Sequence, residues 1–189
     1  MCIRDSLHTI ILTAGEGSRM NSNRAKSLQK IGGKSMLEMI CKTAANLNTK
    51  ITLVVGFDKD SIERESNGFN LDISTIEQPK AIGTGDAVKC GLKNNYNESN
   101  TLILYGDVPL IKRETLQNLI KASEDGICIL TTTIENPHGY GRVKKDEQDN
   151  AVAIIEEKDA NEDEKNIKEI FTGVLCSSTN ILKQAITKI

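Results

Sequence analysis

Short apolar runs alternate with amphipathic segments along most of this chain, and this alternation limits the possible folds more than any other feature. Runs rich in β-branched residues predict strands at 9–12, 51–55, 71–76, 101–105 and 127–134. Their continuous apolarity predicts burial on both faces of a sheet. Between them, apolar residues at helical spacing predict helices around Met36–Leu47, Ala87–Leu92 and Leu116–Ile120. The repeated order of strand, helix and strand predicts an α/β fold: a Rossmann-like, mostly parallel sheet flanked by helices.

The pattern changes after residue 134. Two strands around a polar turn at 146–150 predict a small antiparallel excursion, and the charge run at 161–169 indicates a surface turn or short helix. A further strand begins at Glu169, and a helix from about Ser178 completes the predicted domain, which covers 9–189. Residues 1–8 show no pattern, and we interpret them as a disordered tail or as non-native sequence from cloning.

Composition argues against several classes of function. The chain has 189 residues, a net charge of −2, three Tyr, three Phe and no Trp, which provides neither a basic groove nor the aromatic rings that stack on bases. We therefore expect no nucleic-acid partner. No apolar run approaches the roughly 20 residues that a membrane span requires. The five cysteines form no C-x-x-C pair, which argues against zinc. Cys90, Cys128 and Cys176 lie in apolar segments, so we expect buried thiols in a cytoplasmic protein.

The segment "LTAGEGSRM", residues 12–20, follows the first predicted strand. It lacks the third glycine of G-x-G-x-x-G, and it is not a P-loop. The polar segment that follows carries several cations, which are Arg19, Arg24, Lys26, Lys30 and Lys34. Glycine backbone N–H groups beside fixed cations suit a triphosphate. An ordinary surface loop remains the alternative.

Two other segments follow predicted strands. In "LYGDVPL", Asp107 lies at the carboxyl end of a strand, where a carboxylate can bind Mg²⁺ or serve as a turn residue. In "EQPKAIGTGDA", Gln78 carries a donor and an acceptor that suit a pyrimidine edge, and Gly83 and Thr84 open a helix. In "HGYGR", Gly141 indicates either a close approach of the backbone to a ligand or a tight turn. We find no pairing of a nucleophile with a base.

Together these segments resemble one family. "LTAGEGSRM…AKSL", "QPKAIGTGDA", "LYGDVPL", "GYGR", "IIEEKDA" and "TGVL" occur in the order found in bacterial N-acetylglucosamine-1-phosphate uridylyltransferases, from about Thr9 to the end of the chain. The resemblance implies the nucleotide-diphospho-sugar transferase fold and the N-terminal domain of a bifunctional enzyme. It also implies a Mg²⁺-assisted reaction of UTP with N-acetylglucosamine-1-phosphate, which yields UDP-N-acetylglucosamine and pyrophosphate.

The resemblance also implies roles for individual residues. Arg19 and Lys26 would be catalytic and face the triphosphate, and Asp107 would bind Mg²⁺. The resemblance also implies substrate-binding residues: Leu12, Thr13, Ala14 and Gly15 for the nucleotide; Gln78, Gly83 and Thr84 for the uracil; Gly141, Glu156 and Thr172 for the sugar; and Tyr105, Gly106 and Asp107 without a stated part of the substrate.

The chain departs from the family pattern in three places. Ala25 stands where the family usually has Pro before the catalytic lysine, which predicts a looser loop. Phe171 stands where an Asn usually contacts the ligand, and a phenyl ring cannot donate that hydrogen bond. The family's second Mg²⁺ ligand and its β-helix acetyltransferase domain would lie beyond Ile189. We therefore expect a truncated nucleotidyltransferase domain that is monomeric, whereas the full-length family forms trimers.

Three alternative functions remain open from the sequence. One is a related transferase that uses another sugar or nucleotide. Another is a nicotinamide-dependent oxidoreductase in which Asp58, after the second strand, holds a ribose. The third is a non-catalytic module that binds a nucleotide sugar.

Overall fold

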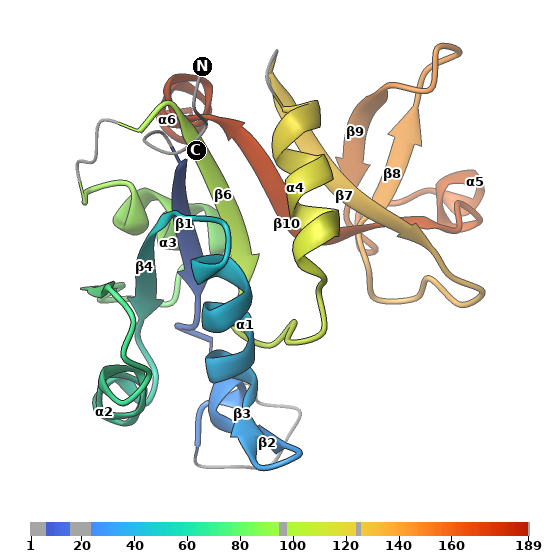
Figure 1. Ribbon diagram of the computed structural model, residues 1–189. Coiled ribbons are helices and arrows are strands. Elements are labelled where there is room, and N and C mark those ends of the chain that lie inside the picture. The colour runs from blue at the N-terminus through green and yellow to red at the C-terminus, as the bar shows by residue number, and fades with distance from the viewer. Residues whose placement is uncertain (1–6, 16–23, 95–97, 124–125, 189) are drawn as a thin grey trace. The chain divides into compact units, whose positions relative to one another are not determined.

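The computed structural model describes residues 7–15, 24–94, 98–123 and 126–188 (Figure 1). The chain divides into two compact units, and each has its own arrangement of strands and helices. The large unit comprises Met1–Cys128 and Leu175–Ile189, and the small unit comprises Ile129–Val174.

Parallel strands form the sheet of the large unit. They are β1 (Leu7–Leu12), β4 (Lys50–Val55), β5 (Ile73–Glu77) and β6 (Asn100–Tyr105), in the order β5-β4-β1-β6. The last residue of β1, Leu12, lies opposite Val54 on one side and Tyr105 on the other. The end of β10 (Glu169–Ser178) runs antiparallel to β6, with Leu175 opposite Ile103. The predicted α/β fold with a mostly parallel sheet is confirmed.

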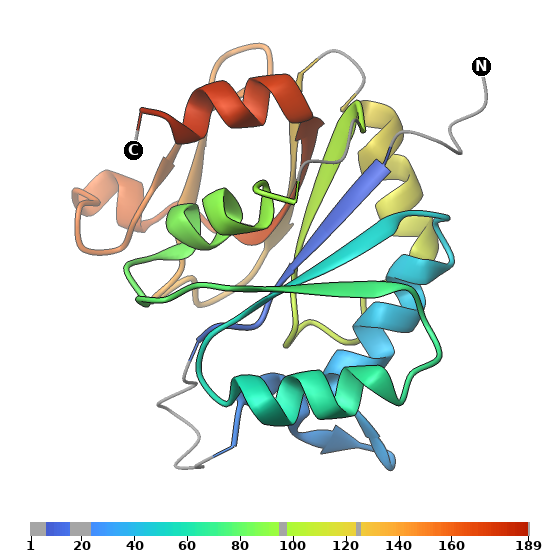
Figure 2. The ribbon, with the colours of Figure 1, turned by 90° about the vertical axis from the view of Figure 1, so that its left-hand side faces the viewer.

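Helices cover both faces of this sheet. They are α1 (Met36–Ala45), α2 (Lys59–Asn67), α3 (Thr84–Gly91), α4 (Arg113–Ala122) and α6 (Thr179–Ile186). Helices α3 and α6 lie on one face, and α1 and α4 lie on the other (Figure 2). Among the residues that the structure describes, no helix is long and apolar enough to cross a membrane.

The segment before α1 is compact. A 3₁₀ turn, η3 (Lys26–Leu28), leads into a two-stranded hairpin of β2 (Lys30–Ile31) and β3 (Lys34–Ser35). The Ser35 side chain then caps α1 by accepting a hydrogen bond from the Glu38 N–H at 3.1 Å. Such a cap satisfies one of the N–H groups that the first turn of a helix leaves without a partner.

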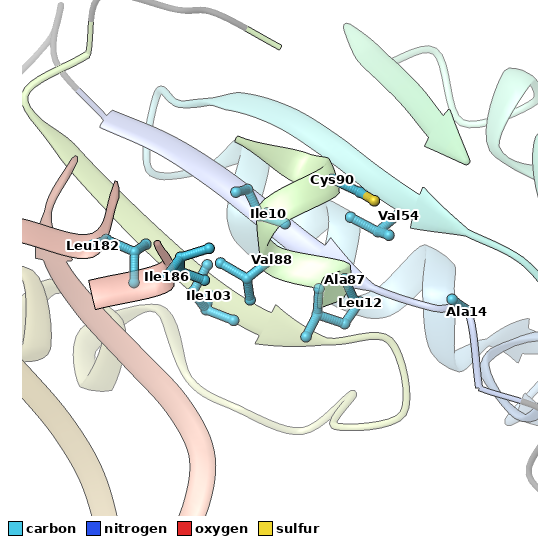
Figure 3. Close-up of a cluster of buried hydrophobic side chains, with 10 residues drawn as sticks. All are labelled: Ile10, Leu12, Ala14, Val54, Ala87, Val88, Cys90, Ile103, Leu182 and Ile186. Carbon is cyan, nitrogen blue, oxygen red and sulfur yellow. The ribbon is translucent and has the colours of Figure 1, made fainter. Parts of the chain in front are cut away.

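The core beneath α3 and α6 holds the large unit together (Figure 3). Strand side chains meet the two helices in one buried cluster, which comprises Ile10, Leu12, Ala14, Val54, Ile103, Ala87, Val88, Cys90, Leu182 and Ile186. Each large apolar side chain buried here contributes roughly 1.5–3 kcal/mol. A Cβ atom at Gly91 would lie only 2.6 Å from Ile10 Cγ2, so glycine at this position lets α3 approach β1 closely.

Strand β1 begins at Leu7 rather than at Thr9. Leu7 and His8 are buried, so they belong to the sheet and not to the predicted tail over 1–8. The remainder of that tail, 1–6, lies outside the described residues. The imidazole of His8 shares a hydrogen bond of 2.8 Å with the hydroxyl of Thr52. A buried, hydrogen-bonded histidine therefore continues the strand at a position where the apolar pattern stops.

Other predictions need correction. Strand β5 is only half-buried, because it lies at an edge of the large unit's sheet, and β7 (Ile127–Thr133) has exposed ends. The prediction that these two strands are buried on both faces is therefore wrong. Helix α2 was not predicted, because it buries only Ile62 and Ser66 and its sequence lacks an apolar stripe.

The small unit contains the predicted antiparallel excursion. Strands β8 (Arg142–Lys145) and β9 (Ala151–Ile155) form a hairpin, and the charge run contains the short helix α5 (Glu162–Lys165). The Asp146 carboxylate accepts hydrogen bonds from the backbone N–H groups of Gln148 and Asn150 at 3.0 and 2.8 Å. These bonds, that from Asn150 above all, lower the pKa of Asp146 and secure the hairpin turn.

Candidate functional site

A cavity of about 490 Å³ opens at the carboxyl ends of the parallel strands in the large unit. Its walls come from the end of β1, from η3, from the segment between β5 and α3, and from the end of β6. The lining residues are Leu12, Thr13, Ala14, Gly15, Lys26, Ser27, Gln78, Ala81, Gly83, Thr84, Ala87, Tyr105 and Asp107. Both the size and the position at the strand ends are typical of a small-molecule site in an α/β protein.

The floor of the cavity is a rigid backbone. Thr13 donates two hydrogen bonds to the carbonyl of Val54, from its N–H at 2.9 Å and from its hydroxyl at 2.7 Å. The Gly106 N–H donates to the carbonyl of Leu12 at 3.0 Å. A Cβ atom at Gly106 would lie 2.7 Å from Thr13 Cγ2 and 3.0 Å from Ser27 Cβ. Glycine at 106 therefore lets the ends of β1 and β6 pack directly against η3.

The side-chain amide of Gln78 is held in one orientation. Its Nε2 donates to the carbonyl of Gly83 at 3.0 Å and to the carboxylate of Asp86 at 2.9 Å. Both amide hydrogens are thus used within the protein, which leaves the Oε1 atom as the group that can accept a hydrogen bond from a ligand. Gly83 caps α3 with φ of +130°, a conformation that side-chain-bearing residues rarely adopt.

A cation and a carboxylate also meet in the lining of the cavity. The ammonium of Lys26 lies 2.6 Å from Oδ2 of Asp107, and both side chains are partly exposed. Lys26 comes from η3 and Asp107 follows β6, so the tertiary fold joins residues 81 positions apart. An ammonium group is suited to bind a phosphate, and a carboxylate is suited to bind a metal ion.

Comparison with known proteins agrees with this geometry. The profile of the family described as the MobA-like NTP transferase domain matches residues 9–155, which include the cavity and its lining residues. The chain belongs to this family. Similar curated proteins are each described as "Bifunctional protein GlmU". The chain is 42% identical to the one from Psychrobacter sp. over 96% of its length, 42% to the one from Ruthia magnifica over 97%, and 43% to the one from Neisseria meningitidis over 91%.

The chain spans only about 40% of the length of these relatives. Among solved structures, a crystal structure described as a glucose-1-phosphate thymidylyltransferase from Bacillus anthracis, in complex with a sucrose, superposes on this NTP transferase domain with a TM-score of 0.75. The alignment covers 97% of this chain and 79% of that chain at 16% identity. At this identity, the likeness extends to the fold alone.

The structure places most of the predicted nucleotide residues around one cavity. Ten of the residues predicted to be catalytic, to bind metal or to bind substrate line it: Leu12, Thr13, Ala14, Gly15, Lys26, Gln78, Gly83, Thr84, Tyr105 and Asp107. Gly106 lies directly behind this lining, against Thr13 and Ser27. Arg19 lies outside the described residues.

The other predicted loop cations have different surroundings. Arg24 forms an ion pair with Glu65 of α2 at 2.9 Å, and Lys30 and Lys34 lie on the exposed β2–β3 hairpin. The sequence predicted several cations beside the phosphates. In the described part of the segment, only one of them, Lys26, lines the cavity.

The predicted sugar residues belong to the small unit. A Cβ atom at Gly141 would lie 3.7 Å from Glu156 Oε1, so these two residues are neighbours. The hydroxyl of Thr172 donates to the carbonyl of Leu130 at 2.7 Å and so supports the sheet. Phe171, where the resemblance predicts an Asn, donates its backbone N–H to the carbonyl of Gly141 at 2.9 Å.

Sequence reasoning missed several residues of the site. Ser27, Ala81 and Ala87 line the cavity, and Asp86 orients Gln78. Small apolar and hydroxyl residues carry no chemical signal in a sequence. Asp86 could have been noticed, because an acidic residue in the first turn of a helix is often part of a hydrogen-bond arrangement.

The carboxylate named in the oxidoreductase hypothesis has a partner within the protein. The Asp58 carboxylate, which would have to hold a ribose, accepts a hydrogen bond from the backbone N–H of Ala25 at 3.0 Å. Ala25 is fully buried. Ala25 itself is enclosed and its N–H is bound. The rest of the loop that was predicted to be looser, 16–23, lies outside the described residues, so that expectation stays a prediction.

Proposed function

We propose that this NTP transferase domain is a uridylyltransferase that acts on a sugar-1-phosphate, with UTP and N-acetylglucosamine-1-phosphate as substrates and UDP-N-acetylglucosamine and pyrophosphate as products. The observation that carries the proposal is the pairing of Lys26 with Asp107 in the cavity that Gln78 also lines. The similarity to proteins named GlmU over nearly the whole chain supports the choice of substrates.

The reaction requires no general base. The second pKa of a phosphate monoester is about 6, so a sugar-1-phosphate is already an anionic nucleophile near neutral pH. Its oxygen attacks the α-phosphorus of UTP, and the bond from that phosphorus to the bridging oxygen of pyrophosphate breaks. The described lining residues contain neither His nor Cys, which is consistent with this chemistry.

Catalysis then depends on alignment and on the neutralisation of charge. The ammonium of Lys26 can stabilise negative charge that develops on the departing pyrophosphate. Arg19, by its place in the same loop, is proposed for the same task. Removing one such electrostatic group costs roughly 3–4 kcal/mol of transition-state stabilisation.

Asp107 is the proposed Mg²⁺ ligand. No group of three or more His, Cys, Asp or Glu side chains that could hold a metal occurs among the described residues. A single carboxylate nevertheless fits Mg²⁺, which commonly keeps several waters and binds through one or two carboxylates and the phosphates of a substrate. When bound, the ion would neutralise phosphate charge and orient the triphosphate. Binding of the ion to Asp107 would free Lys26 for the phosphates.

The orientation of Gln78 favours uracil over cytosine. With Nε2 bound to Gly83 and Asp86, the Oε1 atom can accept the N3–H of uracil. The N3 atom of cytosine is an acceptor and would face Oε1 without a hydrogen. In the small unit, Gly141, Glu156 and Thr172 are the proposed sugar residues. Because the Thr172 hydroxyl already donates to Leu130, it would serve the sugar as an acceptor.

The thiols support a proposal for the cellular setting. The cysteines at 41, 90, 128 and 176 are free, and free thiols are typical of a reducing compartment. We therefore propose that the protein acts in the cytoplasm. We also propose that this chain by itself is a monomer, which light scattering would test.

The function is tested by combining UTP, N-acetylglucosamine-1-phosphate and Mg²⁺ with the chain and measuring pyrophosphate release. We expect UDP-N-acetylglucosamine as the product. We also expect Lys26→Ala to lower kcat/KM by roughly a hundredfold or more, because a positive charge beside the phosphates is lost. In parallel, UTP with Mg²⁺ should raise the melting temperature. A rise caused by NADH and not by UTP would refute the proposal.

A further inference from the structure

The turn between β4 and α2 contacts both ends of the loop that carries Arg19. Before the loop, the Phe57 N–H donates to the carbonyl of Ala14 at 3.3 Å. After the loop, the Asp58 carboxylate accepts the Ala25 N–H at 3.0 Å. The turn is also packed tightly, since a Cβ atom at Gly56 would lie 3.0 Å from Ala14 Cβ. One turn, Gly56–Asp58, thus holds the backbone on both sides of this loop.

The bond to Asp58 determines where η3 begins. Ala25 is fully buried, and its carbonyl accepts the Leu28 N–H at 3.0 Å in the first bond of the turn. Its own N–H points away from the turn and would be a buried donor without a partner if Asp58 were absent. Lys26 follows directly. The Asp58–Ala25 bond therefore lies one residue from the side chain that faces Asp107.

The backbone of Asp58 adopts a left-handed conformation, which Asp and Asn tolerate better than other residues that bear a side chain. Its φ of 55° and ψ of 34° lie in the left-handed region, which is costly for most residues that bear a side chain. Glycine would adopt this backbone without cost. The Asp58 carbonyl starts α2 by accepting from the N–H groups of Ser61 and Ile62, a task that any residue performs. Only the carboxylate can hold Ala25.

We propose that Asp58 is a positioning residue for Lys26. By accepting the Ala25 N–H, it anchors η3 against the β4–α2 turn and so places the lysine ammonium at the cavity wall. A second connection, from Arg24 to Glu65 of α2, supports the same segment from the exposed side. The role of Asp58 in catalysis rests on the function proposed above, whereas its role as an anchor does not.

The first test removes the carboxylate without straining the backbone. Asp58→Gly suits the left-handed conformation, and we expect it to lower kcat/KM for UTP by about ten- to a hundredfold, because misplaced catalytic groups lose that much. Asp58→Asn keeps a carbonyl oxygen that can accept the Ala25 N–H and tolerates the same backbone, so it should retain activity within about threefold. Glu63→Gln is the matched control, since Glu63 lies on α2 and accepts from the Thr75 hydroxyl instead.

The second test replaces the Asp58–Ala25 hydrogen bond with a proline at position 25. Ala25 has φ of −51° and ψ of 139°, which a proline can adopt. Ala25→Pro alone places its ring against the Asp58 carboxylate, so it should lose activity. Combined with Asp58→Gly, the proline needs no acceptor and fixes the backbone by itself, so the double variant should recover to within about threefold of the wild type. Two harmful single changes that cancel each other would show that Ala25 and Asp58 are directly coupled.

A third measurement is independent of activity. Hydrogen exchange of the Ala25 amide, followed by NMR without substrate, should accelerate at least tenfold in Asp58→Gly and remain slow in Asp58→Asn, because a buried, bound N–H exchanges only on local opening. Unchanged exchange would overturn the anchor. Accelerated exchange with an unchanged kcat/KM would overturn the positioning role. If the wild type released no pyrophosphate, the proposed function would fail, and the exchange data alone would decide the anchor.

Discussion

Polar side chains at the two ends of the parallel strands in the large unit differ in their exposure to solvent. At the carboxyl ends, Lys26 and Asp107 form an ion pair in the lining of an open cavity, and their side chains remain 44% and 29% exposed. Towards the amino ends, His8 and Thr52 are hydrogen-bonded in the interior and almost inaccessible to solvent. The first arrangement leaves charges ready for a ligand, whereas the second satisfies polar groups inside the protein.

The buried arrangement continues beyond this pair. The Thr52 hydroxyl also lies 3.0 Å from that of Ser74, and Asn94 donates to both, at 3.3 and 3.1 Å. Burial lowers the pKa of His8 to about 4. Glu98 opposes this shift, and Lys50 and Lys183 add to it. The comparison therefore predicts that changes at the open end affect activity and that changes at the closed end affect stability.

The largest expected effect is at the open end. Asp107→Ala removes the proposed Mg²⁺ ligand, so we expect kcat/KM to fall by roughly 10²–10³-fold. The melting temperature should change little, because a partly exposed ion pair contributes at most about 1 kcal/mol. Steady-state kinetics and thermal unfolding measure the two quantities. A large fall in melting temperature would mean that the pair is structural, contrary to the comparison.

Acid should act mainly at the closed end. His8 is neutral when the protein is folded, so its contribution to stability is complete above pH 6.5 and is lost as the pH falls towards about 4. This shift corresponds to about 3 kcal/mol of the free energy of unfolding. Urea unfolding at a series of pH values measures it. His8→Gln, which can still bond to Thr52 but does not titrate, should flatten this dependence; an equal slope in both proteins would contradict the assignment.

The smallest effect concerns selectivity. Asp86→Ala frees the Gln78 amide to rotate, because the carboxylate that accepts its Nε2 is lost. We expect the preference for UTP over CTP, as a ratio of kcat/KM values, to fall about five- to tenfold, which is the value of one hydrogen bond. Asp86→Asn, whose side-chain oxygen can still accept from Nε2, should keep most of the preference. If both variants retain it fully, Gln78 does not read the base.

Local patterns in the sequence were enough to predict much of the fold and several residues of the site. The apolar runs and the helical spacing predicted β1, β4, β6 and most of the helices, because the signals lie within one element. The glycine loop and Asp107 were predicted as site residues because strands of a parallel sheet end at a shared edge. Helix α2 was missed, since Ile62 is its only buried apolar residue and its packing depends on neighbours.

Contacts between distant residues were decided by the tertiary structure alone. The sequence presents Asp58, Asp86 and Asp107 as equivalent carboxylates after strands or at helix starts. In the structure, the first holds Ala25, the second orients Gln78 and the third pairs with Lys26. Separate segments meet only when the chain folds, so no local pattern records which partner each carboxylate has. The sequence thus determined which groups could do chemistry, and the fold determined which of them face the cavity.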